Sequence, residues 1–295
     1  MTGAERGFLL LTAHLGNPGE KTLTIAQFRE LTRRCRMMEK PQIQRELTQQ
    51  DLMALGCDSV FAERVITLLS RQEQLDWYLQ KARSAKCQPV SRIGQIYPAR
   101  LHKALGMDAP ACLWLKGDVN ILNRPSVSLV GSRELQPENR EFARAIGLQA
   151  AKQGYVLVSG NARGADREAQ ESCLKNGGYV ICVVADSLQT HPEKDRVLYM
   201  AEDGFDMSFS APRALSRNRI IHALSDKTFV AQCSLHKGGT WSGTKYNLRH
   251  GLSDVYCFFD GSPAAEELCA MGAGKVDVSN QSDWFTQESG QLKLM

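Results

Sequence analysis

From residue 126 onward, short apolar runs of strand character alternate with stretches that carry apolar residues at helical spacing. Strands that are joined by crossover helices favour a parallel sheet. The sequence therefore predicts an α/β fold with a mainly parallel, Rossmann-like sheet. The expected strands are residues 126–130, 155–158, 179–184, 207–209, 229–231 and 255–259. The expected helices are residues 138–152, 166–175, 194–203, 216–225, 241–250 and 263–271.

The beginning of the chain has a different pattern, because residues 24–86 keep apolar positions at helical spacing throughout. Thr48 and Asp58 stand where N-caps of short helices are expected. Pro- and Gly-bearing stretches then interrupt the helical period at residues 89–98 and 107–125, and both are interpreted as joints. We expect a small all-helical N-terminal domain (1–88), a Rossmann-like domain (89–275) and a C-terminal tail (276–295) whose Trp284 and Phe285 pack back on the sheet.

Composition excludes several classes of protein. A chain of 295 residues with 43% hydrophobic content is long enough for about two domains with full cores. No apolar run approaches the ~20 residues that span a bilayer, so we expect a cytoplasmic protein without membrane contact. The 9 cysteines include no Cys-x-x-Cys spacing, which argues against a zinc site or a disulfide framework. The net charge of +4 leaves nucleic acid open as a partner without favouring it.

The residues suited to binding an anionic ligand lie in the loops at the carboxyl ends of the expected strands. Glycine, hydroxyl and arginine side chains gather there, ahead of helix N-termini whose amides attract anions. Each loop taken alone is also compatible with an ordinary turn, but together they suggest a site for an extended polyanion or a nucleotide. The candidate phosphate-binding residues are Gly131, Ser132, Arg133, Ser159, Gly160, Arg163, Gly164, Asp166, Arg217, Asn218, Arg219, Gly238, Gly239, Thr240, Ser242, Gly243 and Thr244.

Motifs of the common nucleotide enzymes are missing from these loops. The sequence has no Walker A pattern, and no Gly-x-Gly-x-x-Gly follows the first expected strand of the sheet. The 6 histidines are scattered and form no metal-ligand spacing. We therefore expect a binding protein rather than an enzyme, with no cofactor and no metal.

The order of these motifs resembles the DNA-processing protein A family (DprA, also called Smf). The resemblance covers about residues 90 to 275, and it implies an extended Rossmann-like fold that binds single-stranded DNA, forms a homodimer and loads a RecA-type recombinase during natural transformation. It also implies that the Gly-Ser-Arg loop holds DNA phosphates and that the two following motifs line the same pocket. The motifs that carry it are Tyr97-Pro98-x-x-Leu101, Leu115-Lys116-Gly117-Asp118, Val130-Gly131-Ser132-Arg133, Val158-Ser159-Gly160-Asn161-Ala162-Arg163-Gly164-Ala165-Asp166 and Arg217-Asn218-Arg219-Ile220-Ile221-x-x-Leu224-Ser225.

The chain departs from the pattern of that family at the position of a base-stacking aromatic. Ala214 and Leu215 stand where the family usually has Phe-Pro, three residues ahead of Arg-Asn-Arg. The stacking contact is therefore missing or has moved, with Phe209 and Trp241 as the candidates.

Two other functions stay open from the sequence. Residues 238–244 resemble the Gly-Gly-x-Gly-Thr loop of lysine-decarboxylase-like phosphoribohydrolases, which suggests a nucleotide-binding sensor or a phosphoribohydrolase-like protein. Those enzymes place a Glu shortly after the Thr, whereas residues 245–248 here read Lys-Tyr-Asn-Leu. A scaffold is the other alternative, because residues 1–95 carry 14 Lys and Arg against 10 Asp and Glu.

Overall fold

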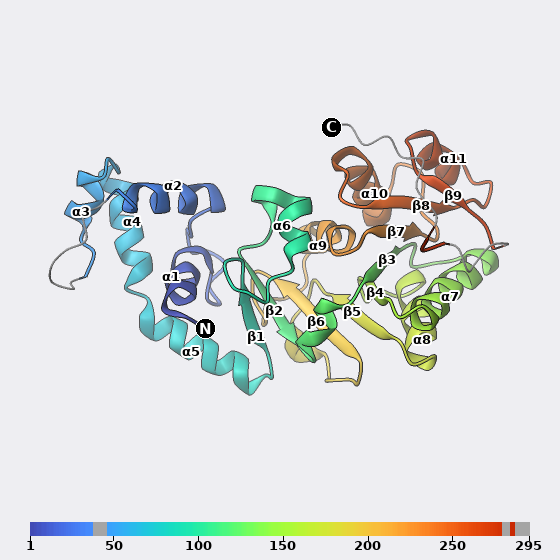
Figure 1. Cartoon of the computed structure of the whole chain (residues 1–295), viewed down its shortest axis with the longest axis horizontal. Coiled ribbons are helices and arrows are strands. Elements are labelled where there is room, and N and C mark those ends of the chain that lie inside the picture. Colours follow the sequence, from blue (N-terminus) through green and yellow to red (C-terminus); the bar gives the residue numbers. More distant parts are fainter. Residues whose placement is uncertain (38–45, 279–283, 287–295) are drawn as a thin grey trace.

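A computed structural model describes residues 1–37, 46–278 and 284–286. In this part of the chain, one nine-stranded sheet has the order β1-β2-β6-β5-β4-β3-β7-β8-β9 (Figure 1). From β6 to β9 all neighbours are parallel, while β2 is antiparallel to both β1 and β6. The predicted α/β fold with a mainly parallel sheet is confirmed. The strands are β1 (Gln88–Ser91), β2 (Cys112–Lys116), β3 (Ser126–Val130), β4 (Val156–Ser159), β5 (Tyr179–Val183), β6 (Val197–Glu202), β7 (Lys227–Val230), β8 (Asp254–Phe258) and β9 (Gly274–Val276).

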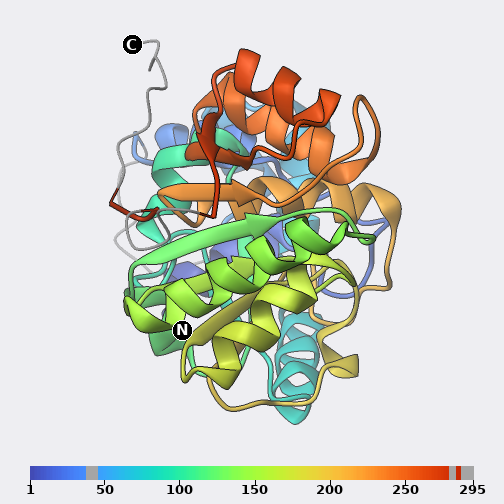
Figure 2. The same cartoon turned by 90° about the vertical axis from the view of Figure 1, so that its right-hand side faces the viewer.

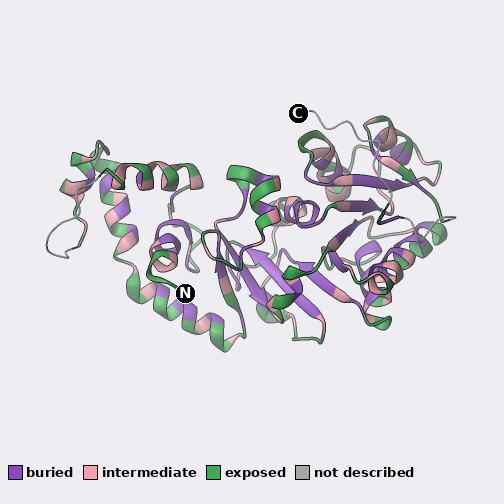
Figure 3. Ribbon diagram, in the orientation of Figure 1, coloured by how far each residue is buried: buried purple, intermediate pink, exposed green. Residues whose placement is uncertain are grey.

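Helices cover both faces of the sheet, because successive side chains of a strand point to opposite faces. In β4, Leu157 joins the core beneath α7 and α8, whereas Val156 and Val158 join the core on the face of α9, α10 and α11 (Figure 2). Apart from the edge strands β1 and β9, the strands are correspondingly almost fully buried (Figure 3). The helices around the sheet are α6 (Ala99–Leu105), α7 (Pro137–Lys152), α8 (Ala165–Lys175), α9 (Ala211–Ala223), α10 (Gly238–His250) and α11 (Pro263–Ala270), with short 3-10 turns η1 (Gly106–Asp108), η2 (Val119–Asn123) and η3 (Leu188–Thr190).

The N-terminal helices form the expected all-helical region. Thr48 and Asp58 cap α3 and α4 through their side-chain oxygens, as the sequence predicts. The region also contacts the sheet, since the rings of Tyr78 on α5 and Trp114 on β2 meet edge to face with centroids 5.1 Å apart. The helices give way to strands between α5 and β1, and the domain boundary at residues 88 and 89 remains a prediction. These helices are α1 (Gly3–Thr12), α2 (Ile25–Cys35), α3 (Gln49–Ala54), α4 (Ser59–Leu69) and α5 (Gln72–Ser84).

Three local predictions are wrong. Residues 194–203, expected as a helix, contain β6, and the expected joint at 107–125 contains β2. Both strands are buried along their whole length, so their residues are apolar without the alternation that distinguishes a strand from a helix. Residues 207–209, expected as a strand, lie in the loop before α9 and pair with no strand of the described sheet.

Two helices begin earlier than predicted. The Ser210 side chain accepts a hydrogen bond from the Arg213 N–H, so α9 starts at Ala211 rather than near residue 216. Similarly, α10 starts at Gly238 instead of residue 241, despite two glycines in its first turn.

The aromatic pair in the C-terminal tail packs on the sheet, as expected, but within a turn rather than a strand or helix. Trp284 is 2% exposed, and its ring centroid lies 5.1 Å from that of Phe142 on α7. Phe285 is also buried and lies 5.1 Å from Tyr155. Most of the predicted tail, residues 276–295, falls outside the described residues. Among those that are described, no helix has both the length and the apolar character required to cross a bilayer.

Candidate anion-binding site at the carboxyl edge of the sheet

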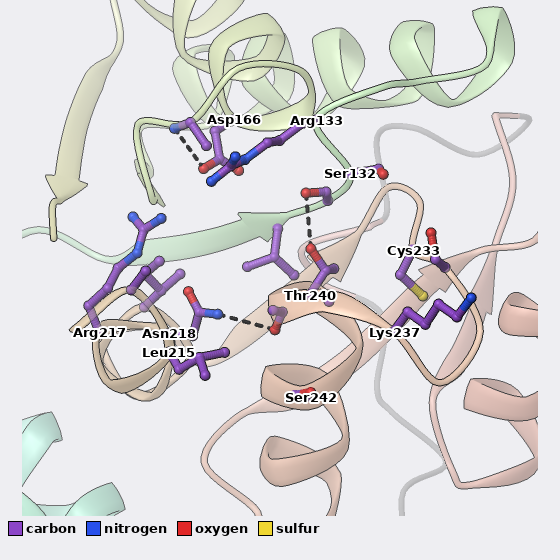
Figure 4. A pocket seen from close by; sticks show the side chains of 18 of the residues that line it. Ser132, Arg133, Asp166, Leu215, Arg217, Asn218, Cys233, Lys237, Thr240 and Ser242 are labelled. Atoms are coloured by element: carbon purple, nitrogen blue, oxygen red, sulfur yellow. Dashed lines mark hydrogen bonds between the residues drawn. The ribbon is translucent and has the colours of Figure 1, made fainter. Parts of the chain in front are cut away.

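A cavity of about 620 Å³ opens beyond the carboxyl end of β3 (Figure 4). In the sheet β3 lies beside β7, and the connections that leave these two strands pass to opposite faces, to α7 from β3 and to α10 from β7. Ligands bind at such a place in open parallel sheets. The cavity is lined by Val130, Gly131, Ser132, Arg133, Ala162, Asp166, Phe209, Ala211, Ala214, Leu215, Arg217, Asn218, Ile221, His222, Cys233, Ser234, Lys237, Gly238, Gly239, Thr240 and Ser242.

The loop after β3 contributes the first wall. A Cβ on Gly131 would come within 2.4 Å of the Ala165 Cβ, so only glycine lets β3 approach the start of α8 this closely. The Ser132 carbonyl in turn accepts a hydrogen bond from the Ala165 N–H at 3.1 Å. The exposed Arg133 side chain then extends over the cavity toward Asp166 (Figure 4).

The loop between β4 and α8 is held together by a buried carboxylate. Asp166 Oδ2 accepts hydrogen bonds from the Gly160 N–H at 3.0 Å and from the Ala162 N–H at 3.1 Å. Burial raises the pKa of Asp166, while the positive charge of Arg217 and these two amides act in the opposite direction. Asp166 therefore shapes the loop from within.

The other predicted residues of this loop also have structural roles. Ser159 is buried and accepts a hydrogen bond from the Gln170 side chain. Gly164 has φ +82°, and a Cβ there would lie 2.3 Å from the Ser132 carbonyl oxygen, so both its conformation and its surroundings require glycine. Arg163 is exposed but does not line the cavity.

Arg217 fixes α9 against the ends of two strands. Its guanidinium donates hydrogen bonds to the carbonyls of Gly160 and Val183, which follow or end β4 and β5. A Cβ on Gly160 would lie 2.1 Å from Arg217 Nη1, so the glycine makes room for this contact. Burial lowers the pKa of Arg217, and the Asp166 carboxylate opposes this shift.

The neighbours of Arg217 point in different directions. Asn218 lines the cavity, and its Nδ2 donates to the Gly239 carbonyl at 3.1 Å (Figure 4). Arg219 does not reach the cavity: Nη1 donates to the Asp108 carbonyl at 2.8 Å, and Nη2 lies 3.2 Å from Glu202 Oε2. The structure therefore does not place Arg219 with the other predicted site residues.

The N-terminus of α10 forms the opposite wall. Lys237 occupies the N-cap position and no side chain caps the helix there, so the amides of its first turn have no acceptor within the helix. Thr240 Oγ1 donates to the Gly131 carbonyl at 3.0 Å, which joins the two walls (Figure 4). Ser242 also lines the cavity, whereas Thr244 is buried inside α10 and Gly243 faces α9.

Several lining residues were not among the predicted site residues. Cys233 and Ser234 follow β7, and the rule that selected the loops after β3 and β4 applies equally to this one. His222 stands one helical turn after Asn218, on the same face of α9. Burial lowers the pKa of His222 to about 4 and raises the pKa of Cys233 to about 12, so both side chains are neutral at pH 7.

The two candidate stacking aromatics differ in exposure. Trp241 is 4% exposed and packs against His236, which rules it out as a platform for a base. Phe209 is 60% exposed at the cavity, and Leu215, which also lines it, is 54% exposed.

Comparison with known proteins identifies the family. Residues 90–267 match the family described as DNA recombination-mediator protein A. The chain is 31% identical over 141 residues to DNA processing protein DprA of Streptococcus pneumoniae, covering 44% of this chain and 50% of that protein. It is 27% identical over 200 residues to Protein Smf of Escherichia coli, covering 61% of this chain and 52% of that protein. The chain thus spans about half the length of these curated relatives.

Solved structures show the same fold. The X-ray structure of DprA from Streptococcus pneumoniae superposes with a TM-score of 0.71 at 24% identity, over 98% of this chain and 99% of that one. DprA from Helicobacter pylori, studied for its single-stranded DNA binding mode, gives a TM-score of 0.56 at 24% identity, over 68% of this chain and 94% of that one. Together with the match over residues 90–267, which is more than half of the sequence, this places the chain in the DNA recombination-mediator protein A family.

Proposed function

We propose that the chain binds single-stranded DNA at this cavity, with phosphates between the loop after β3 and the start of α10. The observation that carries the proposal is the convergence of two cationic side chains, Arg133 and Lys237, with the hydroxyls of Ser132 and Ser242 around one cavity. The uncapped first turn of α10 adds amide donors that attract anions. The Helicobacter pylori relative, which binds single-stranded DNA, supports this choice of polyanion.

Arg217 has a different role in this proposal. Nη1 of its guanidinium donates to both the Gly160 and the Val183 carbonyl, so Arg217 holds α9 in place and adds positive potential to the cavity that it lines. Phe209 supplies the stacking surface, because it is the exposed aromatic ring at the cavity.

The wider role of the family extends the proposal. We infer that the chain acts in the cytoplasm as a homodimer that loads a RecA-type recombinase on the strand it binds, during DNA uptake or recombination. Support for this comes from membership of the recombination-mediator family. Light scattering of the purified protein tests the dimer, and recombinase filament assembly on strands precoated with a single-strand binding protein tests the loading.

A nucleotide hydrolase is less well supported by the lining of the cavity. Asp166 is the one carboxylate among the described lining residues, and two backbone amides occupy its Oδ2. General acid or base catalysis needs a carboxylate that reaches the reacting bond. We therefore propose binding without catalysis, and incubation with nucleoside monophosphates should release no base.

Fluorescence anisotropy of a labelled oligo-thymidine tests the proposal over a salt series. Removing one phosphate contact in Arg133→Ala should weaken binding and reduce the slope of log K against log salt by about 0.7. Arg249→Ala removes the same charge at the other end of α10 and should bind like the unaltered protein. A flat salt response, or identical behaviour of the two variants, contradicts the proposal.

A further inference from the structure

A row of helices along one side of the molecule carries positive charge with almost no carboxylates. In this row α10 packs against α9, α9 against α6, and η1, which follows α6, against α2 (Figure 1). The helices α6, α9 and α10 contain no Asp or Glu, and α2 contains Glu30 as its one carboxylate. By contrast, α8 on the other face of the sheet holds three carboxylates and two cations. The row therefore produces a positive potential on one side of the protein, and the cavity lies toward one end of it, between α9 and α10.

The cations at the other end of the row form a basic stripe along α2, made of Arg29, Arg33 and Arg36. The first two are four residues apart and the third follows three residues later, so all three lie on one face, and all three are exposed. Arg33 and Arg34 both donate to Glu30, so one carboxylate serves two guanidinium groups. Among the described residues, no carboxylate forms an ion pair with Arg29 or Arg36. The stripe therefore keeps a net positive charge at the surface.

The turn η1 connects the basic stripe to α9. Arg29 Nη1 lies 2.8 Å from Met107 Sδ in this turn. From the other helix, Arg219 Nη1 donates to the Asp108 carbonyl at 2.8 Å. Arg92 adds a third cation, and its guanidinium donates to backbone carbonyls within and next to η1. Burial and the positive charge of Arg29 both lower the pKa of Arg92, which shows that the two cations are neighbours. The stripe thus lies about two helix diameters, roughly 20–25 Å, from the cavity on the far side of α9.

We propose that the basic stripe binds phosphates of the DNA strand where the strand continues beyond the cavity, across α9 and η1. Exposed guanidinium groups bind phosphate diesters through charge-assisted hydrogen bonds. Phe28, the aromatic residue of α2, packs edge to face against Phe8, so the stripe offers no ring on which a base could stack. The contact is therefore to the backbone and independent of base sequence. This inference rests on the proposed binding of single-stranded DNA, and it gives a role to the excess of Lys and Arg in residues 1–95.

The test uses anisotropy with strands of two lengths. Glutamine at all three positions of the stripe removes the charges and keeps good helix formers in α2. The triple variant Arg29→Gln, Arg33→Gln, Arg36→Gln should bind oligo-thymidine of about 20 nucleotides severalfold more weakly, and its slope of log K against log salt should be smaller by about 2, at about 0.7 for each lost phosphate contact. Oligo-thymidine of about 5 nucleotides occupies the cavity without reaching α2, so its binding should not change.

The matched control removes three exposed cations at the amino edge of the sheet. Lys152, Lys175 and Lys194 lie ahead of β4, β5 and β6, at the opposite edge from the cavity. Their triple glutamine variant should bind both strands like the unaltered protein. Equal losses in the two triple variants, or a loss on the short strand as well, overturn the proposal. Unchanged binding of the long strand to the stripe variant also overturns it, and contact with an acidic protein would then be the remaining use of the stripe.

A measurement on the unaltered protein keeps the test decisive if the stripe variant fails to fold, which thermal melting reveals. The salt slope of the unaltered protein should be steeper by about 2 for the long strand than for the short one. Equal slopes for the two lengths overturn the contact with the stripe. Absence of salt-sensitive binding to either strand would instead overturn the proposed function itself.

Discussion

Arg219 Nη2 lies 3.2 Å from Glu202 Oε2, and this ion pair joins α9 to the end of β6. The Glu202 side chain is 5% exposed. Burial raises the pKa of Glu202, while Arg219 favours its ionised form. The pair therefore fixes the helix that carries Asn218 and His222, although neither of its members lines the cavity.

Arg219→Ala should lower the free energy of unfolding by about 2–4 kcal/mol, because it leaves the buried Glu202 carboxylate without its cation. Urea denaturation measures this loss. The double variant with Glu202→Gln should recover part of it, since the uncompensated charge is then gone. Arg163→Ala, an exposed arginine outside the cavity, should change stability by less than about 0.5 kcal/mol. Equal stability of Arg219→Ala and Arg163→Ala would contradict this account.

Buried His222 should make stability depend on pH. Burial lowers its pKa from 6.5 to about 4, so between these values the unfolded chain binds a proton that the folded protein does not. The contribution of neutral His222 to stability is fully present above the pKa of the unfolded state. It is lost as the pH falls toward the pKa of the folded state, which lowers the free energy of unfolding by about 2 kcal/mol between pH 7 and pH 4.5. Urea titrations at both pH values measure the difference, which should be smaller in His222→Gln by this amount. An unchanged difference would refute the assignment.

The two aromatic residues at the start of α9 and α10 should respond differently to substitution. Phe209→Ala removes an exposed ring and should weaken oligo-thymidine binding by a stacking energy of about 1–3 kcal/mol, with little change in melting temperature. Trp241→Ala removes a buried ring, so its main effect should be a lower melting temperature. Anisotropy and thermal melting of both variants separate the two roles.

Much of the fold can be predicted from the sequence, because the spacing of apolar residues indicates which faces of a helix or strand are buried. The strands β3, β4, β5, β7 and β8 were expected within one or two residues, since each is a short apolar run and all but β5 precede an α-helix. Periodicity failed at β2 and β6, where both faces are buried and no alternation is left to detect. The antiparallel pairing of β2 depends on contacts between distant residues, which no local pattern contains.

The candidate site could be predicted where the strands of the sheet were predicted correctly. Arg133, Asn218 and Thr240 all line the cavity, because each lies in a loop or helix at the carboxyl edge of a parallel strand. Sequence position could not show which arginine of the Arg-Asn-Arg motif turns inward, since that depends on the buried partner that each one meets. Glu202, the partner of Arg219, comes from β6, a strand that the sequence had assigned to a helix.

A side chain at position 160 should disturb Arg217, because a Cβ there would lie 2.1 Å from Arg217 Nη1. Gly160→Ala must displace the guanidinium from the carbonyls that hold it, so we expect a loss of about 1–3 kcal/mol in stability together with weaker strand binding. Gly7→Ala is the matched control, since no atom lies within 4 Å of its Cβ position in α1 and alanine favours a helix. Urea denaturation and anisotropy of both variants test the contact. Equal behaviour of the two would contradict it.

Trp284 should contribute to stability although it lies far along the chain from the rest of the core. Its ring packs against Phe142 with centroids 5.1 Å apart, and its Nε1 donates to the Asp277 carbonyl at 3.1 Å. Trp284→Ala should therefore cost about 3–5 kcal/mol in the free energy of unfolding, as expected for a large buried side chain. Trp77→Ala removes a ring that is 57% exposed on α5 and should cost less than about 1 kcal/mol. If urea denaturation gave both variants the same small loss, the tail would not be part of the core that supports α7 and the loop after β3.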